Sequence, residues 1–237
     1  MNRRLTYSGD LSADHLRWFV KTSGFTNEDN QSNLVRLQKE ILAEKDAAFA
    51  YFFALECGYQ THLMQKLILD KKNAKYAFHF ALNIDNTDIK ALQNVVAESN
   101  KIEYITKFAC FVPGADRKLL ENLIINAKKP KYVHMYLKHV KGASLVKFKD
   151  IIIESGKPSY LYELAKHLKS PADITQIEDL IIKSNSFTYI RLFAEKIKTA
   201  DVDKLEQAVL ATNDSKEIKK FAKYVKKSKM KQFLLVG

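Results

Sequence analysis

The stretch that decides the fold is Tyr160–Asn185, which reads YLYELAKHLKSPADITQIEDLIIKSN. It contains two apolar patterns, each with the spacing of one face of a helix. The first pattern consists of Leu161, Leu164, Ala165 and Leu168, and the second of Ile174, Ile177, Leu180 and Ile181. The residues between the two patterns, Ser-Pro-Ala-Asp, are typical of a turn that leads into a helix. The stretch therefore predicts a hairpin of two helices.

The same unit recurs along the chain. Its signature is an aromatic residue, a second large apolar residue four positions later, and usually Ala directly after it. The copies are Phe49/Phe53/Ala54, Tyr76/Phe80/Ala81, Tyr104/Phe108/Ala109, Tyr132/Tyr136/Leu137, Tyr160/Leu164/Ala165, Tyr189/Phe193/Ala194 and a degenerate Glu217/Phe221/Ala222. Their successive spacings are 27, 28, 28, 28, 29 and 28 residues. So constant a period predicts a stack of repeats.

The second helix of each unit has its own start and stop signals. A short polar residue precedes its apolar pattern and is predicted to be the N-cap: Asp88, Asp116, Ser144, Asp173 or Asp201. Residues suited to a left-handed backbone follow it: Asn100, Gly156, Asn185 and Asn213. Pro130 and Pro158 precede first helices, where a missing N–H costs little. Arg117 replaces the first apolar residue of its copy, so that helix should be frayed or differently packed.

A hairpin of about 28 residues is too small to bury its own apolar face, so its neighbours must cover it. We therefore expect an all-α fold, an α-solenoid of about seven stacked two-helix repeats over residues 46–237. Residues 1–45 fit the repeat less well and hold the only tryptophan, Trp18. They are expected to form an irregular N-terminal helical cap, continuous with the repeats as one domain.

Composition agrees with this fold and limits the cellular setting. Among 237 residues there are only 7 Gly and 4 Pro, which argues against a many-stranded β fold. The longest nearly continuous apolar stretch, Ala47–Leu55, is far shorter than the roughly 20 residues that cross a bilayer. Two cysteines, Cys57 and Cys110, lie in apolar helical stretches and indicate small core residues in a reducing compartment. We expect no membrane association and a cytoplasmic location.

The sequence shows no motif for catalysis, a cofactor or a metal. Zinc-binding, dinucleotide-binding and phosphate-loop signatures are absent. His139 and His167 occupy equivalent repeat positions, and surface histidines are favoured there over a shared site. Glu121, Glu178 and Glu206 also recur at one position, which is interpreted as a solvated helix face, and the recurring tyrosines are interpreted as packing residues. No catalytic, cofactor-binding or metal-binding residue is therefore assigned.

Basic residues give the clearest indication of function. The formal net charge is +12, and residues 215–237 hold eight Lys against Glu217. When the repeats are aligned on their first aromatic residue, Lys and His recur six, seven and nine positions later along the last four first helices. These candidate binding residues are Lys138, His139, Lys141, Lys166, His167, Lys169, Lys196, Lys198, Lys223 and Lys226. A basic residue at the C-terminal end of a helix complements the helix dipole, and this explains the lysines nine positions after the first aromatic residue. It does not explain the basic residues six and seven positions after it.

The quoted unit resembles the short helical-hairpin repeats, HEAT-like in style, of uncharacterised bacterial and phage proteins. The resemblance covers residues 46–229 and implies a solenoid scaffold with a binding role. One HEAT-like group, the alkylpurine DNA glycosylases, has similar size and basicity. Its members are expected to carry several Trp and an Asp in a cleft, and this chain departs from that pattern because Trp18 is its only tryptophan.

These observations lead to an ordered set of expectations about function. The first is a non-enzymatic α-solenoid that binds a macromolecule, a protein in preference, along its extended surface. The alternative is nucleic-acid binding through the lysines without reading of sequence, because Arg, the commonest reader of bases, is nearly absent from them. A glycosylase-type repair enzyme on the same scaffold is the third.

Overall fold

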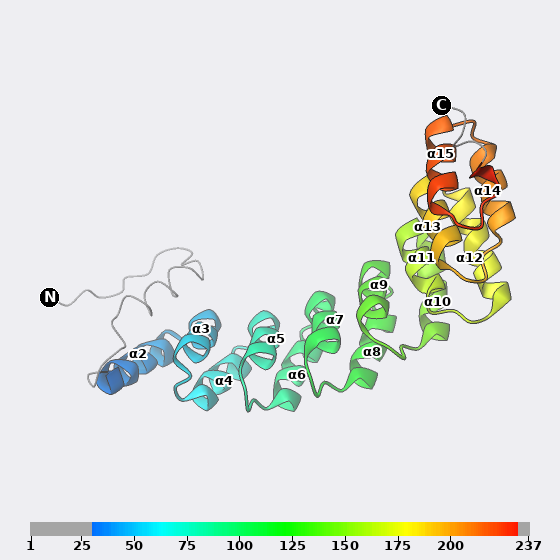
Figure 1. Ribbon diagram of the computed structural model, residues 1–237. Helices are drawn as coiled ribbons and strands as arrows, with labels where there is room; N and C mark the ends of the chain where they lie inside the picture. Colours follow the sequence, from blue (N-terminus) through cyan, green and yellow to red (C-terminus); the bar gives the residue numbers. More distant parts are fainter. Residues whose placement is uncertain (1–29, 232–237) are drawn as a thin grey trace. The chain divides into compact units, whose positions relative to one another are not determined.

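The structure, a computed structural model, describes residues 30–231, and that range contains fourteen α-helices and no strand (Figure 1). Of the cap predicted over residues 1–45, only α2 (Asn30–Glu44) lies within it. The other helices are α3 (Ala47–Cys57), α4 (Thr61–Asp70), α5 (Ala74–Asn83), α6 (Ile89–Glu98), α7 (Ile102–Phe111), α8 (Arg117–Asn126), α9 (Pro130–His139), α10 (Leu145–Ser155), α11 (Pro158–Ala165), α12 (Pro171–Lys183), α13 (Phe187–Lys196), α14 (Val202–Leu210) and α15 (Ser215–Tyr224).

The helices pack as consecutive hairpins within two units, Met1–Leu123 and Ile124–Gly237. We call the first helix of each hairpin the A helix and the second the B helix. In the first unit the A helices α3, α5 and α7 pack side by side, with α4 and α6 against them. In the second unit the A helices α9, α11, α13 and α15 do the same, and α10, α12 and α14 each contact the A helices before and after them (Figure 1). The predicted all-α architecture of stacked hairpins is confirmed within each unit.

The core follows the repeat signature. The second large residue of each copy is buried, as Phe53, Phe80, Phe108, Tyr136, Leu164, Phe193 and Phe221. So is the alanine that follows it, at 54, 81, 109, 165, 194 and 222. Burial of one such large apolar side chain contributes roughly 1.5–3 kcal/mol. Because each hairpin supplies the same residues at the same positions, its neighbours complete one continuous core in each unit.

Helix ends agree with most of the predicted signals. Asp88, Asp116 and Asp201 each accept a hydrogen bond from the backbone N–H three residues later, at 2.9, 3.1 and 3.1 Å. The backbone is left-handed at all four predicted stop residues, with φ between 53° and 61°. Pro130 and Pro158 are the first residues of α9 and α11. Arg117 starts a regular α8, and its guanidinium Nε donates to the Ala109 carbonyl at 3.3 Å, so this copy is repacked instead of frayed.

One predicted N-cap, Asp173, is wrong, and another, Ser144, lacks the expected capping hydrogen bond. Ser144 is the N-cap residue of α10, but its side chain makes no capping hydrogen bond. Asp173 lies inside α12, because Ser170 caps that helix and Pro171, with its preset φ, begins it earlier. The carboxylate of Asp173 instead pairs with the Lys149 ammonium of the preceding repeat.

The recurring tyrosines lie between successive A helices, as their interpretation as packing residues requires. Each contact joins two consecutive copies of the repeat. It is made by the residue two positions after the first aromatic residue of one copy and by the first aromatic residue of the next copy. Ring centroids of Tyr51 and Tyr76 are 6.0 Å apart, and those of Tyr162 and Tyr189 are 6.1 Å apart. His134 stacks on Tyr160 at 4.4 Å. An aromatic contact thus recurs along the A-helix layer of each unit.

A second recurring contact joins four of the B helices (α4, α6, α12 and α14) to the start of the following B helix or, for α14, of the turn after α15. A side-chain oxygen accepts the backbone N–H of the residue 23 positions later. The pairs are Gln65 with Asp88 (3.0 Å), Gln93 with Asp116 (2.7 Å), Glu178 with Asp201 (2.9 Å) and Glu206 with Lys229 (2.9 Å). We call this contact the inter-repeat clasp. It satisfies a backbone donor that the N-terminus of a helix or turn would otherwise leave unpaired.

For Glu178 and Glu206 the clasp overturns the interpretation of the recurring acids as a solvated helix face, whereas Glu121 is half-buried on α8. Glu178 is only 2% exposed and Glu206 is also buried. Both point inward because the neighbouring repeat presents an N–H donor there, a tertiary partner that helix periodicity does not reveal. Burial raises the pKa of Glu178, although the Asp201 N–H and the Lys204 ammonium act to lower it.

Glu178→Gln keeps the acceptor for Asp201 and removes a buried charge, so we expect the free energy of unfolding to rise at pH 7. A raised pKa means that the folded chain binds this proton more tightly than the unfolded chain does. The free energy of unfolding of the wild type should therefore increase as the pH falls through the folded pKa toward the ordinary value of 4.5. The Gln variant has no such proton to bind and should not show this increase. Urea denaturation between pH 5 and 8 measures both effects.

Glu178→Ala is the matched control for this prediction. It leaves the Asp201 N–H without its acceptor and should cost about 1–3 kcal/mol. Equal losses of stability in the Gln and Ala variants at pH 7 would contradict the role given to the clasp.

Candidate functional site

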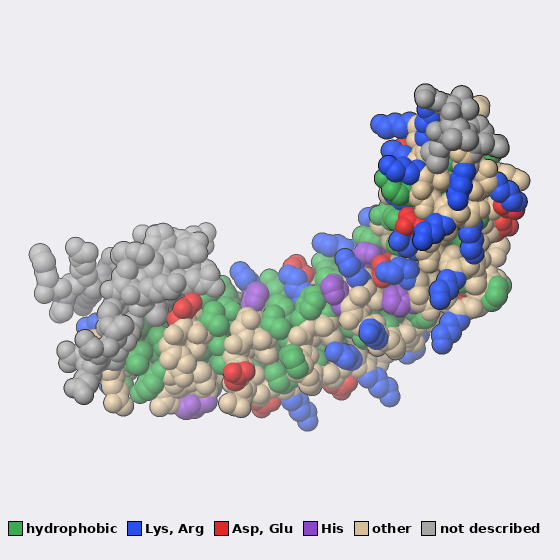
Figure 2. Space-filling view, viewed as in Figure 1, with side chains coloured by type: hydrophobic (Ala, Val, Ile, Leu, Met, Phe, Trp, Pro, Cys, Tyr) green, Lys and Arg blue, Asp and Glu red, His purple; other side chains and the backbone are tan. Residues whose placement is uncertain are grey.

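Nearly all of the net charge lies in one of the two units. Residues 124–237 hold 23 of the 39 Lys and Arg but only 12 of the 27 Asp and Glu, so they carry +11 of the formal +12. Figure 2 shows Lys and Arg side chains gathered over α11–α15. A surface with such an excess of one sign attracts polyanions and raises their rate of encounter. The second unit is therefore where a candidate site is sought.

The structure places the ten candidate residues at the ends of the A helices or directly after them. Lys138 and His139 lie in the last turn of α9, Lys196 in that of α13 and Lys223 in that of α15. Nine of the ten are exposed, and His167 is half-buried. Since packed helices lie about 8–10 Å apart, equivalent residues on adjacent A helices recur at about that interval.

Three of the ten are engaged by carboxylates of their own helices. The Glu163 carboxylate accepts from the Lys166 ammonium at 3.0 Å and lies 3.4 Å from His167 Nε2. Burial acts to raise the pKa of Glu163, but Lys166 and His167 outweigh it and hold that pKa below its usual value. Lys196 pairs with Glu195 at 2.7 Å. Among the described residues no ion pair is found for Lys141, Lys169, Lys198 or Lys226, which follow successive A helices, nor for Lys138 or Lys223.

On the B-helix side the charges of the second unit bind one another. Lys149 pairs with Asp173, Lys204 with Asp179 at 2.5 Å, and Lys229 with Asp203 at 2.6 Å. Each pair joins two adjacent repeats. Asp173, Asp179 and Asp203 of this side are thus matched by lysines of the neighbouring repeats. The lysines without carboxylate partners belong largely to the A-helix side.

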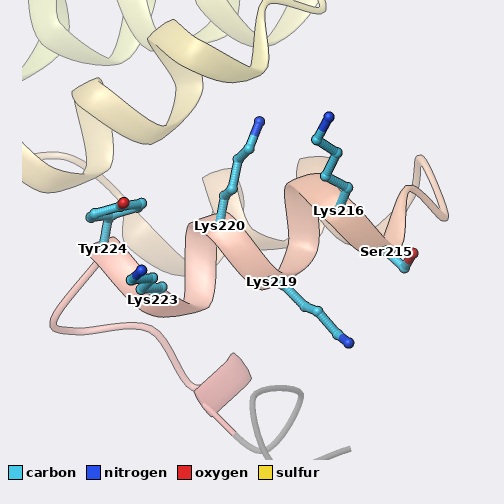
Figure 3. Close-up of a pocket in the computed structure, with 6 residues that line it drawn as sticks. All are labelled: Ser215, Lys216, Lys219, Lys220, Lys223 and Tyr224. Carbon is cyan, nitrogen blue, oxygen red and sulfur yellow. The ribbon is translucent and has the colours of Figure 1, made fainter. Parts of the chain in front are cut away.

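The last A helix, α15, carries a basic cavity that the choice of candidate residues missed. The cavity has a volume of about 480 Å³ and is lined by Ser215, Lys216, Lys219, Lys220, Lys223 and Tyr224 (Figure 3). Lys216 and Lys220 extend from the same side of the helix, one turn apart, and Tyr224 lies at its C-terminal end. Of these six residues only Lys223 was a candidate. The recurrence of Lys at intervals of three and four residues from 216 to 223 was the available signal.

Tyr224 is held in place from the neighbouring A helix. The Arg191 guanidinium lies 4.9 Å from the centre of the Tyr224 ring, and the Lys223 ammonium lies 5.3 Å from it. Arg191 is oriented in turn by the Glu195 carboxylate, at 3.2 Å. Tyr224 nevertheless remains 47% exposed. The result is a fixed aromatic ring beside a row of ammonium groups.

The described residues contain no group of His, Cys, Asp and Glu side chains placed to hold a metal ion. None of their helices has both the length and the apolar character needed to cross a bilayer. Trp18, on which the glycosylase comparison depends, lies outside residues 30–231. Comparison with family models, curated proteins and solved structures found no match.

The two cysteines, Cys57 and Cys110, are half-buried and form no disulfide. Burial raises the pKa of Cys57 to about 11, with a smaller contribution from the charge of Glu56. Burial raises the pKa of Cys110 to about 12, against the opposing effect of Arg117. Both thiols are therefore almost fully protonated near neutral pH.

Since the thiolate is the nucleophile, alkylation by iodoacetamide at pH 8 should be slow. Against a thiol with the ordinary value of 9.0, the thiolate fraction is lower by about 100-fold at Cys57 and about 1,000-fold at Cys110. Mass spectrometry of the alkylated chain gives both rates, and the urea-unfolded chain serves as the control. Equal rates in the folded and unfolded chains would contradict the burial of these thiols.

Proposed function

We propose that this chain is a non-enzymatic α-solenoid scaffold that binds nucleic acid along the A helices of residues 124–237 without reading its sequence. The observation that carries the proposal is a +11 charge in that unit together with exposed lysines that make no ion pair among the described residues, both after the A helices and within α9 and α15. Asp173, Asp179 and Asp203 of the same unit pair with lysines on the B-helix side. We also propose a cytoplasmic location, with which two cysteines that form no disulfide are compatible.

Lysine chemistry determines the kind of binding expected. A phosphate backbone releases counterions when ammonium groups neutralise it, so affinity falls steeply with salt. Lys acts as a point charge, whereas bidentate reading of guanine typically uses Arg. Lys141, Lys169 and Lys198 recur at intervals of about 8–10 Å, a distance that covers two to three phosphates of one strand at about 3.4 Å each. Binding thus rests on several weak contacts.

A triple charge reversal at Lys141, Lys169 and Lys198 (to Glu) tests the proposal. These residues make no ion pair among the described residues, so their replacement should leave helicity unchanged. The affinity for a nucleic-acid 30-mer is measured by fluorescence anisotropy from about 50 to 200 mM salt. At the low-salt end the variant should bind at least tenfold more weakly than wild type. Each lost phosphate contact reduces the steepness of the plot of log affinity against log salt concentration by about 0.7–0.9. The three substitutions together should therefore reduce it by about 2–3.

The matched control reverses Lys66, Lys90 and Lys118, which are exposed on B helices of the first unit. It changes the net charge by the same amount. We expect it to retain most of the wild-type affinity. Equal loss in both triple variants, or no wild-type binding at about 50 mM salt, would overturn the proposal.

A protein partner, which the sequence alone favours, is the second candidate. Residues 1–123 carry a net charge of only +1. In that unit the A helices α5 and α7 expose Leu82 (38%) and Phe111 (41%). Large apolar side chains exposed on adjacent helices are typical of protein contact sites.

The double substitution Leu82→Lys and Phe111→Lys tests this second candidate. A partner captured from the native host at about 300 mM salt, purified and titrated back by calorimetry, should bind the variant at least tenfold more weakly. Val146→Lys is the control, because Val146 is 85% exposed on the B helix α10. A partner that binds both variants alike would refute a site on α5 and α7.

A further inference from the structure

The exposed face of α15 differs from the outer faces of the other A helices. Lys216, Lys219, Lys220, Lys223 and Tyr224 fall within about 140° of its circumference, at 100° per residue. Ile218, Phe221 and Ala222, on the opposite face, are buried. The buried side anchors the helix to the stack, and the outer side presents four ammonium groups and one aromatic ring.

This arrangement opposes the stability of the helix that carries it. Lys216 and Lys220, and Lys219 and Lys223, are like charges four residues apart, and such pairs destabilise a helix. Among the described residues only Lys220 has a carboxylate partner, Glu217, at 2.7 Å. The end of a stack needs polar side chains for solubility, but it does not need four cations on one face. An anion that neutralises them explains the pattern.

The cavity has the dimensions of a nucleotide site. Its volume of about 480 Å³ lies in the range of about 300–1,000 Å³ that small-molecule sites occupy. From Lys216 to Lys223 the helix rises about 10 Å, which matches about three phosphates of one strand. Tyr224 lies at the end of this row with Arg191 over one face of its ring, which leaves the opposite face for a base.

We propose that the exposed face of α15 binds single-stranded nucleic acid, with the lysines on consecutive phosphates and one unpaired base stacked on Tyr224. The inference rests on the proposed function and adds a preference for single strands over duplex. In a duplex the bases stack on one another and offer no free face, whereas every unpaired base can stack on a ring whatever its identity. An acidic polypeptide has no group that gains from the ring, so the fixed aromatic residue favours nucleic acid.

The experiment compares a 20-mer of thymidine, a 20-base-pair duplex and polyglutamate as ligands of the full chain, by anisotropy at about 50 mM salt. Wild type should bind the single strand more tightly than the duplex. Tyr224→Leu, which keeps apolar bulk but removes the ring, should weaken single-strand binding at least tenfold, as expected from stacking on an aromatic ring. Its duplex affinity should change less than twofold. Tyr224→Phe should retain the preference.

A second variant does not depend on Tyr224. Lys216→Glu with Lys220→Glu, on the solvent side of α15, should weaken binding of the single strand. Tyr59→Leu, a half-buried tyrosine of the first unit, is the control and should bind as wild type does.

The outcomes separate the inference from the proposed function. Failure of both nucleic acids to bind would refute the proposed function and the inference together. Equal affinity for strand and duplex, with Tyr224→Leu unchanged, would overturn the inference alone. Polyglutamate bound as tightly as the single strand, and lost in the double-lysine variant, would assign the face to an acidic polypeptide and overturn the inference.

Discussion

Everything else in this structure depends on the fact that no hairpin can cover its own apolar face. Each one is completed by its neighbours through buried large apolar residues such as Phe108 and Phe193, and four of them add the inter-repeat clasp. The clasp is a polar contact in an apolar setting. A side-chain oxygen of one B helix accepts the backbone N–H that starts the next element, and this part-buried hydrogen bond satisfies both groups. Hydrophobic cover sets the strength of the stack, and the clasp adds a directional contact between neighbouring repeats.

The division of labour between the two helix layers follows from this constraint. In residues 124–237 charged side chains of the B helices form ion pairs with neighbouring repeats, as in Lys204–Asp179 and Lys229–Asp203. The A helices touch one another through aromatic rings such as Tyr162 and Tyr189, so the lysines at their C-terminal ends are not required for stacking. A surface that the fold does not need is the one available to a ligand. This separation underlies the assignment of binding to the A-helix side.

Helix periodicity and the 27–29-residue spacing were enough to predict the fold, because the apolar positions of a repeat are dictated by local geometry. They predicted the buried residues, the left-handed stop residues and the packing of the tyrosines. They failed at Glu178, whose partner is a backbone donor 23 residues away, and at Asp173, where Ser170 and Pro171 started the helix early. The alignment of lysines located Lys141 and Lys169 on the exposed surface. It missed Lys216 and Lys220, because the terminal repeat departs from the average of the others.

The clasp has a consequence for how such a chain can change over generations. Gln65 and Gln93 perform in the first unit what Glu178 and Glu206 perform in the second, so the joint tolerates either an amide or an acid. Every joint also involves only two consecutive hairpins. A gene that gains or loses one whole hairpin between repeats that carry the clasp therefore recreates the same joint at the new boundary. Length is the property of this molecule that duplication and deletion can alter most freely.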